Sequence, residues 1–207
     1  MPAASLSHVL RHLRTLSETQ ALRELSDGEL LERFRVRREE SAFVVLVQRH
    51  GPMVLGVCLR SLADVHAAED AFQATFLVLV RKAASIREGA SAAGWLHGVA
   101  RRIALKARLR VARDHALERR SVIMPRDEAC DEPTWVELRA IIDKELEHLP
   151  EKYRTPLILC GLEGKTNDQA ARELGCPKSS LSSRLVRARE LLRARVPLPE
   201  IPVTLAA

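Results

Sequence analysis

The chain has 207 residues, 46% of them hydrophobic and 29% charged, which suits one ordinary globular domain or two small ones and excludes a disordered chain. Basic residues outnumber acidic ones by 33 to 27, and the excess gathers in residues 101–120 and 178–195. Two separate basic blocks indicate that the protein contacts a polyanion, most commonly nucleic acid, at two places. The alternative is that the two blocks are solvent-exposed helix faces without a partner.

Other features exclude further classes of protein. The four cysteines are far apart, with no Cys-x-x-Cys pair and no matching histidine spacing, so we expect no zinc or other metal site, no disulfide framework and no cofactor. No apolar run approaches the roughly 18 residues of a membrane span. The first 20 residues are basic and have leucines at helical spacing, but they lack the core of a signal peptide. We therefore predict an accessory helix within residues 1–25 of a cytoplasmic protein.

Nearly every apolar series has a period of 3.6, which predicts an all-α fold. Ser26 and Glu29 form a capping-box pattern that opens a helix. A second apolar series spans residues 43–62, and Pro52 within it should kink or break the helix. We assign residues 26–113 to a first helical domain.

The segment AEDAFQATFLVLVRK, residues 68–82, predicts an amphipathic helix for which Asp64 can serve as the cap. Its polar side carries a small acidic patch, Glu69, Asp70 and Gln73, inside a basic chain. Its buried side should carry Val65, Ala68, Phe72, Phe76, Leu79 and Ala83.

A small-residue loop is predicted over residues 85–94, followed by a helix from Trp95, which we expect in the core. Leu96, Val99, Ile103 and Ala107 should face inward on that helix. The other face forms a row of cations, Arg102, Lys106, Arg110 and Arg113.

Periodicity fades over residues 114–133, which we interpret as an acidic, proline-bounded linker. A second domain, residues 134–196, opens with a capping-box pair, Thr134 and Glu137, and Pro150 should be the first residue of its next helix. Residues 197–207 form a tail.

The second domain ends in a helix-turn-helix pattern. Thr166 and Gln169 cap a short helix that Gly175 closes, and a longer basic helix follows Pro177. Its inward residues are Leu181, Leu185, Ala188 and Leu192. Outward it presents hydroxyl and cationic groups suited to phosphates and base edges, on Lys178, Ser179, Ser182, Ser183, Arg184 and Arg187.

Four segments in this order resemble bacterial RNA polymerase sigma factors of the sigma-70 family, extracytoplasmic function (ECF) subfamily. They are AFVVLVQRHGPMVLGVCLR, AEDAFQATFLVLVRKA, GWLHGVARRIAL, and the stretch from LPEKYRTPL to VRARELL. The form FQATF resembles planctomycete-type members. The resemblance implies two helical domains, region 2 and region 4, that bind core polymerase and read the −10 and −35 promoter elements to start transcription.

The resemblance also implies partners and roles. The partners would be the β′ coiled coil and β flap of core polymerase, promoter DNA and an anti-sigma factor. Glu69, Asp70 and Gln73 would bind the β′ coiled coil, and the 85–94 loop would accept a base turned out of the duplex. The −10 contacts would come from Arg101, Arg102, Lys106 and Arg110, with Arg102 standing where the family usually has Asn. The −35 contacts would come from Lys178, Ser179, Ser182, Ser183, Arg184 and Arg187.

Two other functions compete. A one-component helix-turn-helix regulator would bind duplex promoter DNA without polymerase. An enzyme would need a catalytic group among His50, His66, His97 and Glu163, but these lie on separate helices and no nucleophile, phosphate loop or metal spacing accompanies them. We therefore predict no enzymatic activity, and we expect His97 to be a surface or partly packed residue.

Overall fold

The computed structural model of the protein describes residues 21–62, 64–83, 86, 91–118 and 135–196. It confirms the all-α prediction, since these residues form helices and turns and no strand. The accessory helix, most of the 85–94 loop, linker residues 119–133, the Thr134 cap and the tail lie outside the described residues.

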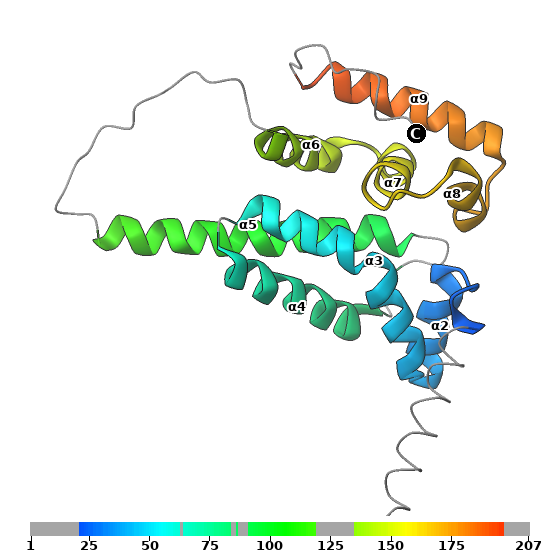
Figure 1. Ribbon diagram of the computed structural model, residues 1–207, viewed down its shortest axis with the longest axis horizontal. Helices are drawn as coiled ribbons and strands as arrows, with labels where there is room; N and C mark the ends of the chain where they lie inside the picture. Colours follow the sequence, from blue (N-terminus) through cyan, green and yellow to red (C-terminus); the bar gives the residue numbers. More distant parts are fainter. Residues whose placement is uncertain (1–20, 63, 84–85, 87–90, 119–134, 197–207) are drawn as a thin grey trace, which may run out of the picture.

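The helices form two groups (Figure 1). The first group, bundle 1, comprises α2 (Asp27–Arg37), α3 (Glu40–Ser61), α4 (Val65–Lys82) and α5 (Ala92–Glu118). The second group, bundle 2, comprises α6 (Trp135–His148), α7 (Glu151–Leu157), the π-helical turn η2 (Ile158–Leu162), α8 (Asn167–Glu173) and α9 (Lys178–Arg193).

The predicted caps of bundle 1 are present. Ser26 accepts a hydrogen bond from the backbone N–H of Glu29, and the Glu29 carboxylate accepts one from the backbone N–H of Ser26. The Asp64 side chain accepts hydrogen bonds from the first backbone N–H groups of α4. Side chains thus satisfy helix donors that have no partner within the helix.

Helix α3 continues through Pro52 without a break, and Figure 1 shows a change of direction along it. Of the two outcomes predicted for Pro52, a kink or a break, the break does not occur. Of the described helices, α3 alone is long and apolar enough to cross a membrane by composition. It also carries the buried polar residue His50, and half of its apolar window is buried. It is therefore the central core helix of bundle 1.

The predicted buried side of α4 is mostly confirmed. Ala68, Phe76 and Leu79 are buried, whereas Val65 is 56% exposed because it is the first residue of the helix and lies at its end. Helix α5 begins at Ala92, three residues before Trp95, and continues through residues 114–118 of the predicted linker. The small residues at its start are buried and allow close packing.

Bundle 2 contains the predicted helix-turn-helix. The capping box of Thr166 and Gln169 opens α8, and Gly175, at φ +57°, makes the left-handed turn before α9. Leu181, Leu185 and Ala188 are buried under α9 as predicted. Pro150 caps α7 from the position before its first residue instead of occupying the first helical position.

The two bundles pack against each other. Figure 1 shows α6, α7 and α8 between α5 and α9, and α3 and α5 contact α6, α7 and η2. Leu146, Ile158 and Leu159 of bundle 2 belong to one continuous apolar core with α3 and α5. At one point the backbones come so close that a Cβ on Gly94 would lie 2.9 Å from the Thr155 hydroxyl oxygen.

Candidate functional site

Helix α4 has one exposed face that carries both polar and apolar side chains. Glu69, Asp70 and Gln73 are all exposed, whereas Ala68, Phe76 and Leu79 of the same helix are buried. Leu77, which is 58% exposed, and Val80 continue the line of Asp70 and Gln73 at spacings of three and four residues. Neither residue was predicted from the sequence as part of this face, although large apolar side chains on the polar side of an amphipathic helix indicate a binding face.

The predicted cations of α5 differ in their surroundings. Arg102, Lys106 and Arg110 are exposed, as a phosphate-binding row requires. Arg101 instead forms an ion pair with Glu147 of α6, and only 13% of its side chain is exposed. One of the four residues predicted to contact the −10 element is therefore paired with a carboxylate of bundle 2 in this structure.

The outer face of α9 carries the predicted hydroxyl and cationic groups. Lys178, Ser179, Ser183 and Arg187 are exposed, and Ser182 and Arg184 are half-buried. The ion pairs of Lys178 with Asp168 and of Arg187 with Glu190 are both 2.9 Å long and exposed, so phosphates can displace them at little cost. Val186, 55% exposed, lies on the same face and was missed by the sequence analysis.

A buried ionic cluster joins the two bundles, and we call it the His50 cluster. His50 of α3 has no exposed surface, and its ring lies between two carboxylates. Its Nδ1 is 2.5 Å from Glu163 Oε1, after η2, and its Nε2 is 2.9 Å from Asp27 Oδ2, at the start of α2, in an ion pair without hydrogen-bond alignment. Arg49 donates a hydrogen bond of 2.6 Å to the other oxygen of Asp27.

The protonation of this cluster follows from its charges. Burial acts to lower the pKa of His50, but the neighbouring carboxylates of Asp27 and Glu163 outweigh it and raise the pKa to about 9. Burial acts to raise the pKa of Asp27, but His50, Arg49 and Lys165 hold it far below its usual range. His50 is therefore an imidazolium at neutral pH, with both ring nitrogens facing carboxylates.

Lys165 completes the cluster from bundle 2. Its Nζ is 3.0 Å from Glu163 Oε2, and it also forms an ion pair with Glu173 of α8. The cluster thus has three cations, Arg49, His50 and Lys165, against three carboxylates. Balanced, paired charge is what makes such burial tolerable.

A second ionic cluster, the Asp143 cluster, lies between α3, α5 and α6. Asp143 accepts a hydrogen bond of 2.7 Å from Arg60 Nε and lies 3.1 Å from His97 Nε2. The pKa of Asp143 is lowered, because the hydrogen bonds from His97 and Arg60 outweigh the effect of burial. His97 has no exposed surface, so the prediction of a surface or partly packed residue is wrong. The reason is the contact with bundle 2, which covers it.

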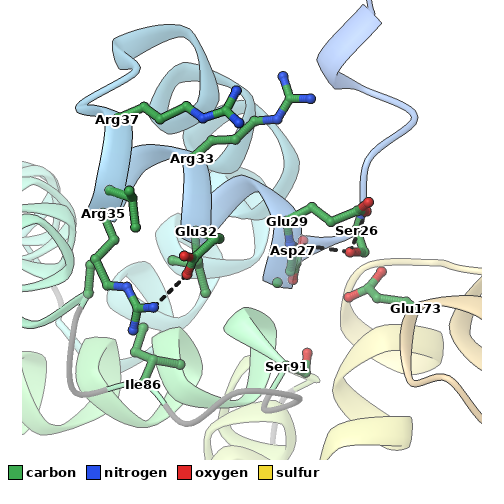
Figure 2. Close-up of a pocket in the computed structure, with 14 residues that line it drawn as sticks. Ser26, Asp27, Glu29, Glu32, Arg33, Arg35, Arg37, Ile86, Ser91 and Glu173 are labelled. Carbon is green, nitrogen blue, oxygen red and sulfur yellow. Dashed lines mark hydrogen bonds and ion pairs between the residues drawn. The ribbon is translucent and has the colours of Figure 1, made fainter.

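A cavity of about 650 Å³ opens beside the His50 cluster, along α2. Figure 2 shows Glu173 of bundle 2 beside Ser26 and Asp27, with Arg33 and Arg37 farther along α2. Because its lining mixes carboxylates with guanidinium groups, the cavity selects no single charge of ligand. Within the described residues, no group of His, Cys, Asp and Glu has an arrangement that could hold a metal ion.

Two family models and several known proteins match this chain. The family model described as sigma-70 region 2 matches residues 46–114, and that of sigma-70, region 4 matches residues 139–192. The RNA polymerase sigma-H factor of Pseudomonas aeruginosa is 30% identical over 191 residues, which are 83% of this chain and 94% of that protein. The ECF RNA polymerase sigma factor SigM of Mycobacterium tuberculosis H37Rv is 30% identical over 169 residues, covering 82% and 84%. This chain belongs to the ECF sigma factors of the sigma-70 family.

The family gives this sigma factor its function, the initiation of transcription as a subunit of RNA polymerase, and does not favour the one-component regulator. Sigma factors as a family are initiation factors without catalytic activity. Among solved structures, RpoE of Bartonella quintana, in complex with the anti-sigma factor NepR, is 21% identical with a TM-score of 0.36, covering 76% of this chain and 98% of that one.

Proposed function

We propose that this sigma factor binds core polymerase through the exposed face of α4 and contacts promoter DNA through α5 and α9. The observation that carries the proposal is the α4 face, where Asp70 and Gln73 are exposed beside Leu77 and Val80. An acidic, partly apolar stripe on a basic protein suits a protein partner with a basic helix, and repels DNA. The β′ coiled coil of core polymerase is the partner that the family implies.

The test is a double substitution on α4. Asp70→Lys with Gln73→Ala should reduce the affinity for core polymerase by at least a hundredfold, because it places a cation where the partner is basic. Helicity should not change, since both side chains point to solvent. Pull-down with purified core, together with circular dichroism, measures both effects.

A matched control is available in Glu24→Lys. Glu24 is also an exposed acidic residue of bundle 1, just before α2 and away from the α4 face. This variant makes the same change of charge and should keep wild-type affinity for core. Equal loss of binding in both variants, or none in either, would overturn the assignment of α4.

The promoter contacts are proposed from exposure and chemistry. Arg102, Lys106 and Arg110 on α5 would hold phosphates near the −10 element, and Arg101 would join them once its pairing with Glu147 opens. On α9, Lys178, Ser179, Ser182, Ser183, Arg184 and Arg187 would contact the −35 element. We infer that the boundaries at residues 26–113, 114–133 and 134–196 separate region 2, linker and region 4.

The location of the protein, its lack of catalytic activity and one further partner are inferred from its family. A factor that works with core polymerase and promoter DNA would act in the cytoplasm, as a binding subunit and not an enzyme. The solved RpoE is recorded with an anti-sigma factor, which supports an anti-sigma factor as a further partner here.

A further inference from the structure

A small cleft lies between α6 and the two helices of bundle 1 that face it, α3 and α5 (Figure 1). It has a volume of about 200 Å³ and shares no lining residue with the cavity along α2. Among the residues that the structure describes, no carboxylate lines it. Its lining combines a serine hydroxyl with two apolar side chains, Leu105 and Ile141, and four basic ones, Arg60, Arg101, Arg108 and Lys144.

Helical period directs the lining residues of α5 and α6 toward the cleft. On α5, Arg101, Leu105 and Arg108 are spaced by four and three residues and therefore lie on one face of the helix. The two lining residues of α6 are three positions apart and share a face in the same way. The row proposed to hold −10 phosphates begins at Arg102, which lies about 100° farther around α5. The cleft is therefore on a different side of α5 from that row.

The charges around the cleft do not cancel. Two carboxylates of α6 neutralise Arg60 and Arg101 in the ion pairs described above. Arg108 and Lys144 are exposed, and within the described part of the chain the side chain of neither has an ion pair or a hydrogen bond. Four cations against two carboxylates leave two positive charges at the cleft, whereas the His50 cluster has as many carboxylates as cations.

Arg60 also has an unused donor. Its Nε donates the 2.7 Å hydrogen bond to Asp143, and only 16% of its side chain is exposed. Its Nη2 is buried and has no hydrogen-bond partner among the described residues. Because a buried donor of a charged group is costly to leave unpaired, an acceptor bound in the cleft would remove that cost. Arg101 likewise uses Nη1 for Glu147 and keeps further N–H groups.

We propose that this cleft binds a phosphate dianion, either as inorganic phosphate or as the end group of a small organic phosphate. The guanidinium groups of Arg60 and Arg101 present paired N–H donors that match phosphate oxygens. Arg108 and Lys144 supply the two charges that balance a dianion. The two apolar side chains lower the local dielectric, which strengthens these interactions.

The volume of the cleft limits the ligand. About 200 Å³ is smaller than the roughly 300–1,000 Å³ of pockets that enclose drug-sized ligands, so the phosphate group fits and a larger organic part would remain outside. A DNA strand offers the same chemistry, but each of its phosphates is flanked by two sugars, which a cleft of this size does not admit. The ligand is therefore a free phosphate compound. Since it contacts helices of both bundles, its binding should stabilise the folded chain.

Titration of the full-length protein tests the site without polymerase or promoter, so the result does not depend on the proposed function. Isothermal titration calorimetry, in a buffer free of phosphate and sulfate, should show one site per chain for inorganic phosphate. Lys144→Gln and Arg108→Gln should each weaken binding by at least about tenfold, because each removes a charge-assisted hydrogen bond. The matched control is Lys152→Gln, an exposed lysine of α7 outside the lining, which should change the affinity less than twofold.

Thermal unfolding separates loss of the site from loss of the fold. Without phosphate, all these variants should melt at the wild-type temperature, since the replaced side chains are exposed. Phosphate should raise the melting temperature of the wild type and of Lys152→Gln by more than that of Lys144→Gln or Arg108→Gln. Binding that does not saturate, or that weakens equally in Lys152→Gln, reflects only screening of surface charge and overturns the site.

Two further measurements identify the source of the phosphate group. Glycerol 3-phosphate that binds as tightly as inorganic phosphate supports an end group, and much weaker binding supports the free ion. The double variant Arg108→Gln with Lys144→Gln lacks none of the proposed promoter contacts, so its holoenzyme should keep wild-type affinity for a promoter fragment selected from a random-sequence pool. If it instead retains phosphate binding and loses promoter affinity, with a salt slope lower by about two, the cleft holds DNA and the free phosphate ligand is overturned.

Discussion

The two bundles distribute their charged side chains differently between solvent and the contact with each other. In bundle 1 the carboxylates of α4 face solvent and its cations at Arg60 and Arg101 face bundle 2. In bundle 2 the cations of α9 face solvent and its carboxylates at Asp143 and Glu163 face bundle 1. Bundle 2 therefore directs cations to solvent and carboxylates to its neighbour, whereas bundle 1 exposes both the carboxylates of α4 and the cations of α5.

This comparison shows why net charge is a poor guide to the interface. The basic blocks at residues 101–120 and 178–195 predict two surfaces for a polyanion, but Arg101 in the first block has a carboxylate as its partner. Four experiments distinguish the groups that face the neighbouring bundle from the groups that face solvent.

The largest effect should come from removing the centre of the His50 cluster. His50→Ala leaves Asp27 and Glu163 buried without their shared cation, which should cost about 3–5 kcal/mol of unfolding free energy. Urea denaturation followed by circular dichroism measures the loss. His66→Ala is the matched control, because His66 is exposed on α4 and its replacement should change stability by less than about 0.5 kcal/mol. Similar small losses in both variants would contradict a buried ionic cluster.

The pH dependence of stability should follow the same cluster. The pKa of His50 is about 9 when folded and 6.5 as its ordinary value, so the folded state binds the proton more tightly. Its contribution is therefore fully present below about pH 6.5 and is lost as pH rises through 9. The groups that face or surround His50 are Asp27, Glu163, Arg49, Lys165 and Glu173.

We expect the wild-type melting temperature to fall between pH 6.5 and 9.5, and His50→Ala to remove most of that fall. Scanning calorimetry in buffers of equal ionic strength gives the comparison. A wild-type melting temperature that is flat or rises over this range would contradict the protonated imidazolium.

The fold was largely predictable because its signals are local. Capping residues at Ser26, Asp64 and Thr166 and the glycine turn at Gly175 act within a few residues, and their predictions are confirmed. The exposure of Asp70 and Arg102 follows from helical period alone.

The contacts between bundles were not predictable in the same way. His50 and Glu163 are 113 residues apart, and nothing in either helix indicates the other. His97 is a polar residue near the start of a helix, and its sequence does not indicate that it is buried beside Asp143 of α6. Pro52 was expected to kink or break α3, and the sequence did not decide between the two; the helix remains continuous and changes direction.

A medium effect is expected where Gly94 of α5 lies against Thr155 of α7. Gly94→Ala places a Cβ 2.9 Å from the Thr155 hydroxyl oxygen, which should push the bundles apart. Within α5, alanine favours the helix by about 1 kcal/mol relative to glycine, so bundle 1 itself should not weaken. Small-angle scattering should show a more extended free protein.

Adding Thr155→Ala to Gly94→Ala provides the internal check. The hydroxyl is then absent and the nearest remaining side-chain atom, Cβ, is 3.8 Å away, which is an ordinary contact. The double variant should return to wild-type dimensions. If Gly94→Ala alone is as compact as wild type, the tight approach of Gly94 to Thr155 does not limit how closely the bundles pack.

The smallest effect belongs to the outer face of bundle 2. Val186 is exposed on α9 between Ser182 and Arg187, where an apolar side chain can contact a thymine methyl group but gains nothing from phosphate. Val186→Ala should therefore weaken holoenzyme binding by about 1 kcal/mol at −35 sequences that have thymine there, and by much less at others. Competition between promoter fragments that differ at single −35 positions measures this preference.

Arg187→Ala is the contrasting variant, because loss of a phosphate contact weakens all sequences alike and lowers the salt slope by about one. If Val186→Ala also weakens every sequence equally, Val186 packs against the DNA backbone. On α9, only the serine and arginine side chains would then contact bases.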